Sequence, residues 1–319
     1  MNYNYYPPEG TLLRTHENTS YISSISGLER AMREGKILEG IAYLCDEELN
    51  LHVDLCGLKG IIPHDECLLT NDGEQIKDIA IITRVGKPVC FKVKSIEPQD
   101  DTYRVILSRR EAQAECRSYY LSSLVPGDII PATVTHLDSF GAFLDVGCGV
   151  PSLLSIDCIS VSRISHPADR LSNGQRLYVA VKLNDTESGR IYVTLKELLG
   201  TWEENACNLG AGQTVSGIVR SVESYGIFVE LSPNLAGLAE HRADNPIISN
   251  IQAGDRVSVF IKSIIPDKMK IKLVLIDAGE KSNERTPLSL FIDPTSTSRI
   301  ERWRYSPLNC QKIIETVFD

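Results

Sequence analysis

Two pairs of aromatic residues are the residues of this sequence best suited to contact a ligand. They are Phe140 with Phe143 and Tyr225 with Phe228, and each pair encloses a glycine and one further residue. An exposed flat ring can stack on the face of an unpaired nucleic-acid base, whatever that base is. One ring of each pair could instead belong to a protein core. We take the four rings as first candidates for a site that binds single-stranded nucleic acid.

The residues around the two pairs repeat without a gap, which predicts repeated domains. Apolar and polar residues alternate on both sides of each pair, a pattern typical of two strands joined by a tight turn. Successive side chains of a strand point to opposite faces, so rings three positions apart share a face only if the backbone is irregular. We therefore expect a bulge or kink at Gly141 and Gly226. The aligned residues are Val134, Phe140, Gly141, Phe143 and Asp145 in one copy and Val219, Tyr225, Gly226, Phe228 and Glu230 in the other.

The sequence downstream of each pair extends the pattern. After the first pair come Gly147, Gly149 and GQRLYVAVKLNDTESGRIYVTLKEL, and after the second come NLAGLAE and AGDRVSVFIKSIIPDKMKIKLVLI. This resembles the S1 domain, an RNA-binding five-stranded barrel repeated in the large S1 protein of the bacterial small ribosomal subunit. The resemblance covers residues 126–277 and reaches back to about residue 36 in weaker form. It implies an all-β chain of three tandem OB-fold barrels with short helical linkers and a C-terminal extension.

The resemblance, together with helix start signals, divides the chain into seven segments. We expect an N-terminal arm and short helix (1–35), a diverged barrel (36–110), a helical linker (111–125), a barrel (126–197), a second helical linker (198–209), a barrel (210–277) and a C-terminal extension (278–319). Capping boxes mark the expected helix starts. They are Ser26 with Glu29, Ser108 with Glu111, Thr194 with Glu197 and Thr201 with Glu204.

The diverged first copy lacks the aromatic pair. Where the other copies carry Phe or Tyr, it has DEELNLHVDL, which is acidic and has no comparable ring. We therefore expect the first copy to fold as a barrel that lacks the residues for RNA binding. A protein-docking or spacer module is the favoured interpretation, and RNA binding by this copy is the alternative.

The S1 resemblance implies further RNA contacts at the turn before the last strand of each barrel. Asp185 and Arg190 match the family's aspartate and arginine in the second copy. In the third copy Asp267 and Lys270 occupy these places, so lysine replaces arginine. The family's histidine after the third strand is replaced by Ser155 and Glu240, and Glu240 would repel phosphate.

Alternation in the last strands predicts which residues surround these positions. The inward set is Ile191, Val193, Leu195, Met269, Ile271 and Leu273, and the outward set is Arg190, Tyr192, Thr194, Lys196, Lys268, Lys270 and Lys272. A row of lysines is more often a solvated or edge-protecting face than a binding site. Because this lysine row lies in the same barrel as a ring pair, RNA binding and a solvated face explain it equally well. Arg163, His166 and Arg170, in the loop SRISHPADR, could likewise reach a phosphate or simply face solvent.

Composition restricts the classes of function. The net charge of −9 argues against non-specific nucleic-acid binding, so an RNA site must be local. The nine cysteines never form Cys-x-x-Cys, which favours reduced buried thiols over a metal site. P-loop, dinucleotide, His-Glu-x-x-His and nucleophile-elbow motifs are absent, so we expect neither an enzyme nor a cofactor. Without an apolar run of membrane-spanning length or a signal peptide, we expect a cytoplasmic protein.

The tail contains SRIERWRY, which alternates strictly enough to be a strand. Burying Trp303 and Tyr305 removes more apolar area than burying Ile300, so we expect these rings to pack on the third barrel and Arg302 and Arg304 to remain outside. If the tail docks beside KMKIKL, the two arginines would extend the lysine row. A disordered tail, favoured by its prolines and its serine and threonine cluster, is the alternative.

Taken with the resemblance, these features predict a protein that binds single-stranded RNA through its second and third copies. The resemblance implies a role near translation, with mRNA and the 30S ribosome as partners, and neither a membrane nor a small-molecule substrate. An adaptor whose barrels dock on a ribosomal or RNA-processing surface without gripping RNA is the alternative.

Overall fold

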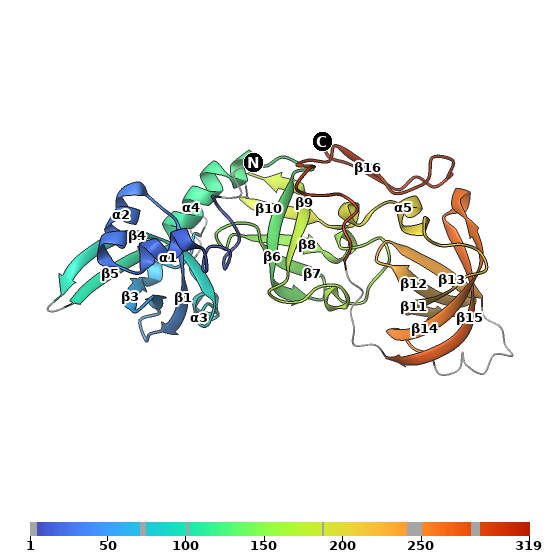
Figure 1. Ribbon diagram of the computed structural model, residues 1–319, viewed down its shortest axis with the longest axis horizontal. Helices are drawn as coiled ribbons and strands as arrows, with labels where there is room; N and C mark the ends of the chain where they lie inside the picture. The colour runs from blue at the N-terminus through green and yellow to red at the C-terminus, as the bar shows by residue number, and fades with distance from the viewer. Residues whose placement is uncertain (1–4, 71–74, 100–101, 187, 241–250, 282–287) are drawn as a thin grey trace.

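The computed structural model describes residues 5–70, 75–99, 102–186, 188–240, 251–281 and 288–319, which form three closed five-stranded barrels. Figure 1 shows the barrels in a row along the long axis. The first contains β1 (Leu38–Cys45), β2 (Leu51–Leu55), β3 (Leu58–Ile62), β4 (Pro88–Gln99) and β5 (Thr102–Ser108). The second contains β6 (Ile129–Asp138), β7 (Gly141–Asp145), β8 (Pro151–Ser155), β9 (Arg176–Asp185) and β10 (Arg190–Thr194). The third contains β11 (Thr214–Glu223), β12 (Gly226–Ser232), β13 (Leu235–Glu240), β14 (Asp255–Ile265) and β15 (Lys270–Lys281).

The three barrels share one strand order. In each, the first three strands form an antiparallel meander, the fourth pairs with the first, and the fifth closes the barrel between the third and the fourth. The third and fifth strands are parallel, as in the pairing of Leu153 with Tyr192 and of Leu238 with Lys272. Closure leaves no unpaired strand edge, which removes a route to aggregation. The expected all-β fold of tandem OB-type barrels is confirmed.

Short helices precede and separate the barrels, and one of them, α3 (Asp78–Ile82), lies within the first barrel between β3 and β4. The others are α1 (His16–Ile22), α2 (Ile25–Glu34), α4 (Arg109–Tyr119) and α5 (Trp202–Ala206). Ser108 caps α4 by accepting from the backbone N–H of Glu111, and Thr201 caps α5, as expected. Helix α2 ends at Gly35, whose φ of +64° suits a residue without Cβ.

Two of the expected helix starts are wrong. Ser24, not Ser26, caps α2, because Ser24 is the extended residue whose hydroxyl accepts from the N–H of Gly27. Thr194 starts no helix because it is the last residue of β10. Its hydroxyl instead donates to the carboxylate of Glu197, in the 3-10 turn Lys196–Leu199.

The N-terminal arm lies between the first and second barrels (Figure 1). Glu9 is buried there, and its carboxylate accepts hydrogen bonds from Arg109 Nε at 2.7 Å and from the backbone N–H of Cys90 at 3.0 Å. The backbone N–H of Glu9 in turn donates to Asp145 in the second barrel at 2.7 Å. Burial raises the pKa of Glu9, but Arg109 outweighs it and holds that pKa below its ordinary value. The arm therefore carries a charged group that joins two barrels.

The second and third barrels meet through another buried carboxylate. Glu230 on β12 accepts from Arg170 in the second barrel and from Arg220 Nε on β11 at 2.6 Å. Arg170 is 2% exposed, so the interpretation of this residue as a phosphate contact on a solvated loop is wrong. Glu230 and Asp145 are aligned in the two copies, so one repeat position supplies the carboxylate at both contacts between barrels.

The tail docks on the second and third barrels. Trp303 and Tyr305 are each 5% exposed, which confirms their expected burial, and Ile300 is buried as well. The strands β16 (Arg302–Arg304) and β17 (Glu315–Val317) pair with each other, and the Tyr305 hydroxyl donates to the Asn234 carbonyl at 2.6 Å.

The tail does not lie beside β15. The backbone N–H of Ile300 donates to the carbonyl of Gly127, at the start of the second barrel. Arg302 pairs with Glu315 at 2.7 Å, and Arg304 donates to the carbonyl of Pro307, so neither arginine extends the lysine row. The buried residues of the second barrel, third barrel and tail form one continuous apolar cluster, which Cys90 of β4 joins. The other buried apolar residues of the first barrel form a cluster of their own.

Candidate nucleic-acid interface

The two predicted ring pairs are exposed and arranged alike. The ring centroids of Phe140 and Phe143 are 5.9 Å apart and those of Tyr225 and Phe228 are 6.2 Å apart, with the planes at 89° in both pairs. Phe140 is 51% exposed and Tyr225 is 61% exposed, while the second ring of each pair is half-buried. An edge-to-face pair leaves the outer ring free to stack on a base.

The backbone irregularity that positions each pair is not at the glycine. The register shift lies on the opposing strand, between Val134 and His136 in the second barrel and between Val219 and Ser221 in the third. Phe140 and Tyr225 belong to the turn, because β7 and β12 begin one residue later. The expected bulge at Gly141 and Gly226 is therefore wrong.

The two glycines are needed for another reason. A Cβ at Gly141 would lie 2.5 Å from the Leu154 carbonyl oxygen, and one at Gly226 would lie 2.6 Å from that of Ala239. Only glycine allows the neighbouring strand to pass this close. The close strand packing fixes where the turn that carries the exposed ring begins.

The second barrel carries a continuous outward row of residues, one on each strand. Directly paired residues of a sheet point to the same face, and the pairing joins His136 to Phe143, Phe143 to Leu153, Leu153 to Tyr192 and Tyr192 to Leu183. The His136 ring lies 6.2 Å from that of Phe143 at an interplanar angle of 27°. We call these five residues the ring row. The predicted residue Tyr192 belongs to it, whereas His136 was missed because the motif does not mark it.

The third barrel has a more polar version of this row. Its members, in strand order, are Ser221, Phe228, Leu238, Lys272 and Ser263. Lys272 stands where the second barrel has Tyr192, and its Nζ lies 3.6 Å from the Glu240 carboxylate. A cation beside an exposed ring pair suits a phosphate next to a stacked base. Glu240 competes with a phosphate for this cation, which weakens the third barrel as a phosphate site.

The first barrel lacks the aromatic pair, as predicted, but it carries one ring at an equivalent place that the prediction missed. The register of β1 and β2 pairs Leu44 with His52, which puts His52 where the other barrels have Phe143 and Phe228. The Tyr43 ring, 42% exposed, lies 6.2 Å from that of His52. His52 also contacts Asp46 at 2.9 Å, and this hydrogen bond lowers the Asp46 pKa to about 2. The ring is thus fixed by a charged carboxylate, which disfavours a nearby phosphate.

The remaining predicted residues flank the rows. Arg190 is exposed two positions before Tyr192 on β10, so both side chains point outward. Its partner Asp185 accepts from the backbone N–H and the hydroxyl of Ser188, at 3.1 and 2.6 Å, and so shapes the turn. Relative to the ring row, Phe140 lies toward one end of the barrel and Arg190 toward the other.

The lysines of the third barrel do not form one strand face. Lys270 and Lys272 lie on β15, whereas Asp267 and Lys268 belong to the 3-10 turn Pro266–Lys268 before it. In the second barrel Thr194 is buried rather than outward, because its hydroxyl bonds to Glu197. Residues 191, 193 and 195 are buried as expected, as are 271 and 273, while Met269 is half-buried.

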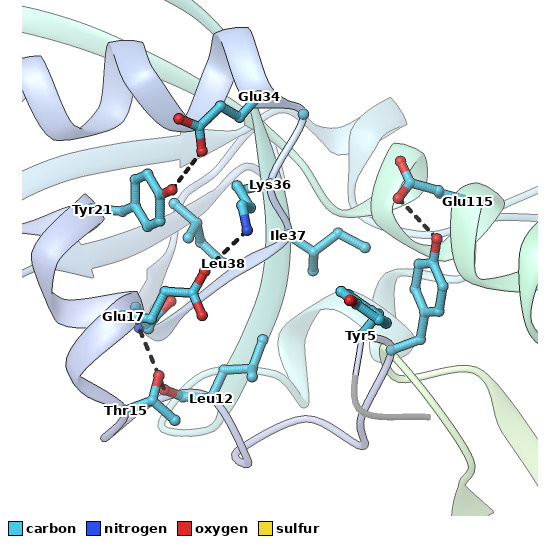
Figure 2. Close-up of a pocket in the computed structure, with 13 residues that line it drawn as sticks. Tyr5, Leu12, Thr15, Glu17, Tyr21, Glu34, Lys36, Ile37, Leu38 and Glu115 are labelled. Atoms are coloured by element: carbon cyan, nitrogen blue, oxygen red, sulfur yellow. Dashed lines mark hydrogen bonds and ion pairs between the residues drawn. The ribbon is translucent and has the colours of Figure 1, made fainter. Parts of the chain in front are cut away.

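A different pocket, of about 350 Å³, lies under the N-terminal arm and is acidic. Figure 2 shows Tyr21 directed at Glu34 and Lys36 directed at Glu17, whose Nζ and Oε1 are 3.0 Å apart. The Tyr6 hydroxyl donates to Glu115 at 3.1 Å, and burial followed by the Glu115 charge raises the Tyr6 pKa to about 12. Three glutamates and one lysine in the lining make this pocket unsuited to phosphate.

The part of the chain that the structure describes holds neither a cluster of metal-ligating side chains nor a long apolar helix. No group of three or more His, Cys, Asp or Glu side chains there could hold a metal ion. Within the same residues, no helix has the length and apolar character needed to cross a membrane.

Comparison with known proteins gives one family match and a set of relatives. Residues 124–196 match the S1 RNA binding domain. Small ribosomal subunit protein bS1 of Leuconostoc lactis is 33% identical over 72% of this chain and 54% of its own length. The bS1 homolog of Bacillus cereus is 33% identical over 73% of this chain and 61% of its own length. The chain thus spans between about half and three fifths of the length of these relatives.

A solved multidomain protein with nucleic acid binding domains from Streptococcus pneumoniae aligns with 76% of this chain at 16% identity. Its TM-score of 0.24 is too low for the overall geometry to bear on function.

Proposed function

Because this chain is an S1-domain repeat protein that resembles small ribosomal subunit protein bS1, we propose that it binds single-stranded RNA on the outer faces of its second and third barrels. The observation that carries this proposal is the pair of exposed edge-to-face rings, in the same geometry, at Phe140 and Phe143 and at Tyr225 and Phe228. Stacking on such rings accepts any base, so the expected substrate is unpaired RNA of mixed sequence.

The residues beside the rings support RNA binding with a different affinity on each of the two barrels. In the second barrel, Tyr192 extends the apolar surface and Arg190 supplies a cation next to it. In the third barrel, Lys270 and Lys272 supply the cations, with Lys268 and Asp267 in the adjoining turn. Asp185 holds the turn before β10 and therefore positions Arg190 rather than contacting RNA. We expect the third barrel to bind less tightly than the second, because Glu240 competes with a phosphate for Lys272.

The similarity to bS1 extends the proposal to the biological setting. We infer a non-enzymatic cytoplasmic protein that holds mRNA in translation and associates with the 30S ribosome. The described residues offer the rings and cations for holding a strand.

Salt dependence tests the proposal. Binding of single-stranded RNA releases counterions, so log K should fall with log[salt] at a slope of about −0.7 for each phosphate contacted. Fluorescence anisotropy of a labelled oligonucleotide at several salt concentrations measures this slope. No binding at low salt would reject RNA binding by this chain.

The alternative, a protein adaptor, has one observation in its favour. The acidic pocket under the N-terminal arm, lined by Glu17, Glu34 and Glu115 among tyrosines, suits a lysine or arginine side chain of a protein partner. The pocket belongs to the first barrel and its arm, so an adaptor contact there is compatible with RNA binding on the other two barrels. Binding of a lysine-rich peptide that is lost on Glu34→Gln would favour the adaptor role.

A further inference from the structure

A cleft of about 880 Å³ opens between the first and second barrels. Its walls come from the N-terminal arm, from the segment between α3 and β4, from β6 and from the turn before β9. The volume lies in the range of about 300–1,000 Å³ that ligand sites occupy. The lining residues that carry the argument are Arg14, Arg84, Lys87, Arg176, Thr133 and His136.

Positive charge dominates the cleft in a chain whose net charge is −9. Four of the lining side chains are lysine or arginine. The two acidic ones, Glu9 and Asp145, are buried and already have partners within the protein. Glu9 pairs with Arg109 at 2.7 Å, and Asp145 accepts from the backbone N–H groups of Glu9, Gly147 and Gly149. Of the four cations, Arg84 also pairs with Glu9 at 3.5 Å and Arg176 donates to the Gly10 carbonyl at 2.7 Å. Arg14 and Lys87 are therefore the cations of the cleft that are available to an anion.

Several polar groups of the cleft lack a partner within the described part of the chain. Arg14 and Lys87 are exposed and form no ion pair there. Thr133 Oγ1 and Arg84 Nε are buried atoms with no hydrogen-bond partner among those residues. Buried polar atoms normally find partners, so these two atoms leave the lining of the cleft polar and unsatisfied. The exposed Arg14 and Lys87 are the groups that a ligand oxygen can reach.

The cleft is continuous with the ring row of the second barrel. His136 lines the cleft and also lies 6.2 Å from Phe143, with the two rings nearly parallel. Thr135, the next residue along β6, lines the cleft as well and donates to the Phe143 carbonyl at 3.1 Å. A strand that stacks on the ring row therefore reaches the mouth of the cleft.

We propose that the cleft between the first and second barrels binds phosphate groups of the RNA strand that lies on the ring row. This inference rests on the proposed RNA binding and adds a second site to it, with the first barrel supplying Lys87 and the arm supplying Arg14. The first barrel then contributes to RNA binding through its edge facing the cleft rather than through its own rings. A free polyphosphate shares the same chemistry, so the test must separate the two sources.

The experiment compares uridine oligonucleotides of about 4 and about 12 residues, a short and a long length within the footprint of about 4–16 nucleotides of one OB fold. The full chain carries Arg14→Gln with Lys87→Gln. We expect the longer oligonucleotide to bind several-fold more weakly and its salt slope to shrink by roughly 0.7 for each phosphate that the cleft no longer binds. Binding of the shorter one, held by the rings, should be unchanged. The control is Arg33→Gln with Lys312→Gln, which removes two exposed cations that do not line the cleft.

Each other outcome overturns the inference. An unchanged slope in the cleft variant, or an equal loss in the control, means that the cleft binds no phosphate of the strand. If tripolyphosphate binds the cleft and is lost in the variant while the longer oligonucleotide is unaffected, the site belongs to a free polyanion. If the wild-type chain binds neither oligonucleotide, the proposed function fails together with this inference. Unchanged thermal melting of the variant excludes misfolding as the cause of a loss.

Discussion

Arg170 and Glu230 form a buried ion pair across the contact between the second and third barrels, 60 positions apart in the chain. Arg170 Nε and Nη1 have no other partner among the described residues, so the guanidinium depends on this one carboxylate. Arg220 also donates to Glu230, which lets one carboxylate hold two cations. The contact therefore depends on an ion pair, Arg170 with Glu230, that is shielded from solvent.

Removing Arg170 should destabilise this contact strongly. Breaking a buried pair leaves an uncompensated charge, and we expect Arg170→Ala to lower the free energy of unfolding by about 3–5 kcal/mol, somewhat less if Arg220 compensates. Chemical denaturation followed by circular dichroism measures the change. The exposed Arg163 of the same loop provides the control, and Arg163→Ala should change stability by less than about 0.5 kcal/mol. Equal effects of the two substitutions would contradict the structural role of Arg170.

The ring pairs should contribute to RNA binding without supporting the fold. Phe140→Ala with Phe143→Ala should weaken binding of an unpaired oligonucleotide by roughly 1–3 kcal/mol for each base that no longer stacks. Tyr225→Ala with Phe228→Ala should also weaken RNA binding, but by a smaller free energy. The outer rings are 51% and 61% exposed, so melting temperatures should change little. A folded variant with wild-type affinity would show that the rings are not the site.

The rings of the first barrel should contribute little to binding. Tyr43→Ala with His52→Ala should change RNA affinity by less than about 1 kcal/mol, because Asp46 holds His52 and its charge opposes a phosphate. Anisotropy under the conditions used for the other pairs measures this. An effect as large as that of the Phe140 and Phe143 substitutions would place a third stacking site on this barrel.

The tail should stabilise the second and third barrels. Truncation after Lys281, the last residue of β15, removes Trp303 and Tyr305, each 5% exposed, and should lower the melting temperature and expose the underlying surface to protease. Tyr305→Phe tests one hydrogen bond alone, because it removes only the hydroxyl that donates to Asn234 at 2.6 Å. We expect it to cost about 1 kcal/mol. A truncated chain with an unchanged melting curve would mean that the tail adds nothing to the fold.

Stability should fall with rising pH through a buried carboxyl beside the N-terminal arm. Burial and the nearby charge of Glu9 raise the pKa of Glu39 from 4.5 to about 8. Between these two values the unfolded chain has lost the proton that the folded chain keeps, so the free energy of unfolding decreases as pH increases. Thermal melts at about pH 5.5 and about pH 8 should show a smaller difference for Glu39→Gln than for the wild type.

The design of that substitution keeps the native hydrogen bonds. One oxygen of Glu39 accepts from the backbone N–H groups of Gly10, Leu12 and Leu13, and the glutamine oxygen can do the same. Glu17→Gln is the control, because Glu17 is a surface residue paired with Lys36. If Glu39→Gln leaves the pH dependence unaltered, another group is responsible, and Asp145, with a pKa raised to about 7 by burial and Glu9, is the next candidate.

Local sequence patterns predicted the fold and the exposed rings. They did not predict the contacts between barrels, because the partners in those contacts are distant in sequence. The aligned spacing of Phe143 and Phe228 was sufficient to find the strands, because the turn before each is short. In the first barrel the loop between β1 and β2 spans residues 46–50, so alignment by spacing did not find His52 at the same place. Arg170 looks like any surface arginine until Glu230 is placed beside it.

The cleft between the first and second barrels could not be predicted from the sequence for the same reason. Arg14, Lys87 and Arg176 carry no shared motif, and they come together only because three segments meet at the first contact between barrels. The docking of the tail could be predicted from the apolar area of Trp303 and Tyr305. Its position could not, since the decisive bonds to Gly127 and Asn234 join residues far apart in the chain.

The placement of Glu9 has a consequence for how the chain folds as it is synthesised. Glu9 leaves the ribosome before its partners Arg109 and Asp145, which follow 100 and 136 positions later. At a synthesis rate of about 5–20 residues per second, the arm waits roughly 7–27 seconds for the second of these partners. The arm thus completes its native contacts only after the second barrel has begun to emerge, and a translating chain must keep that segment available in the meantime.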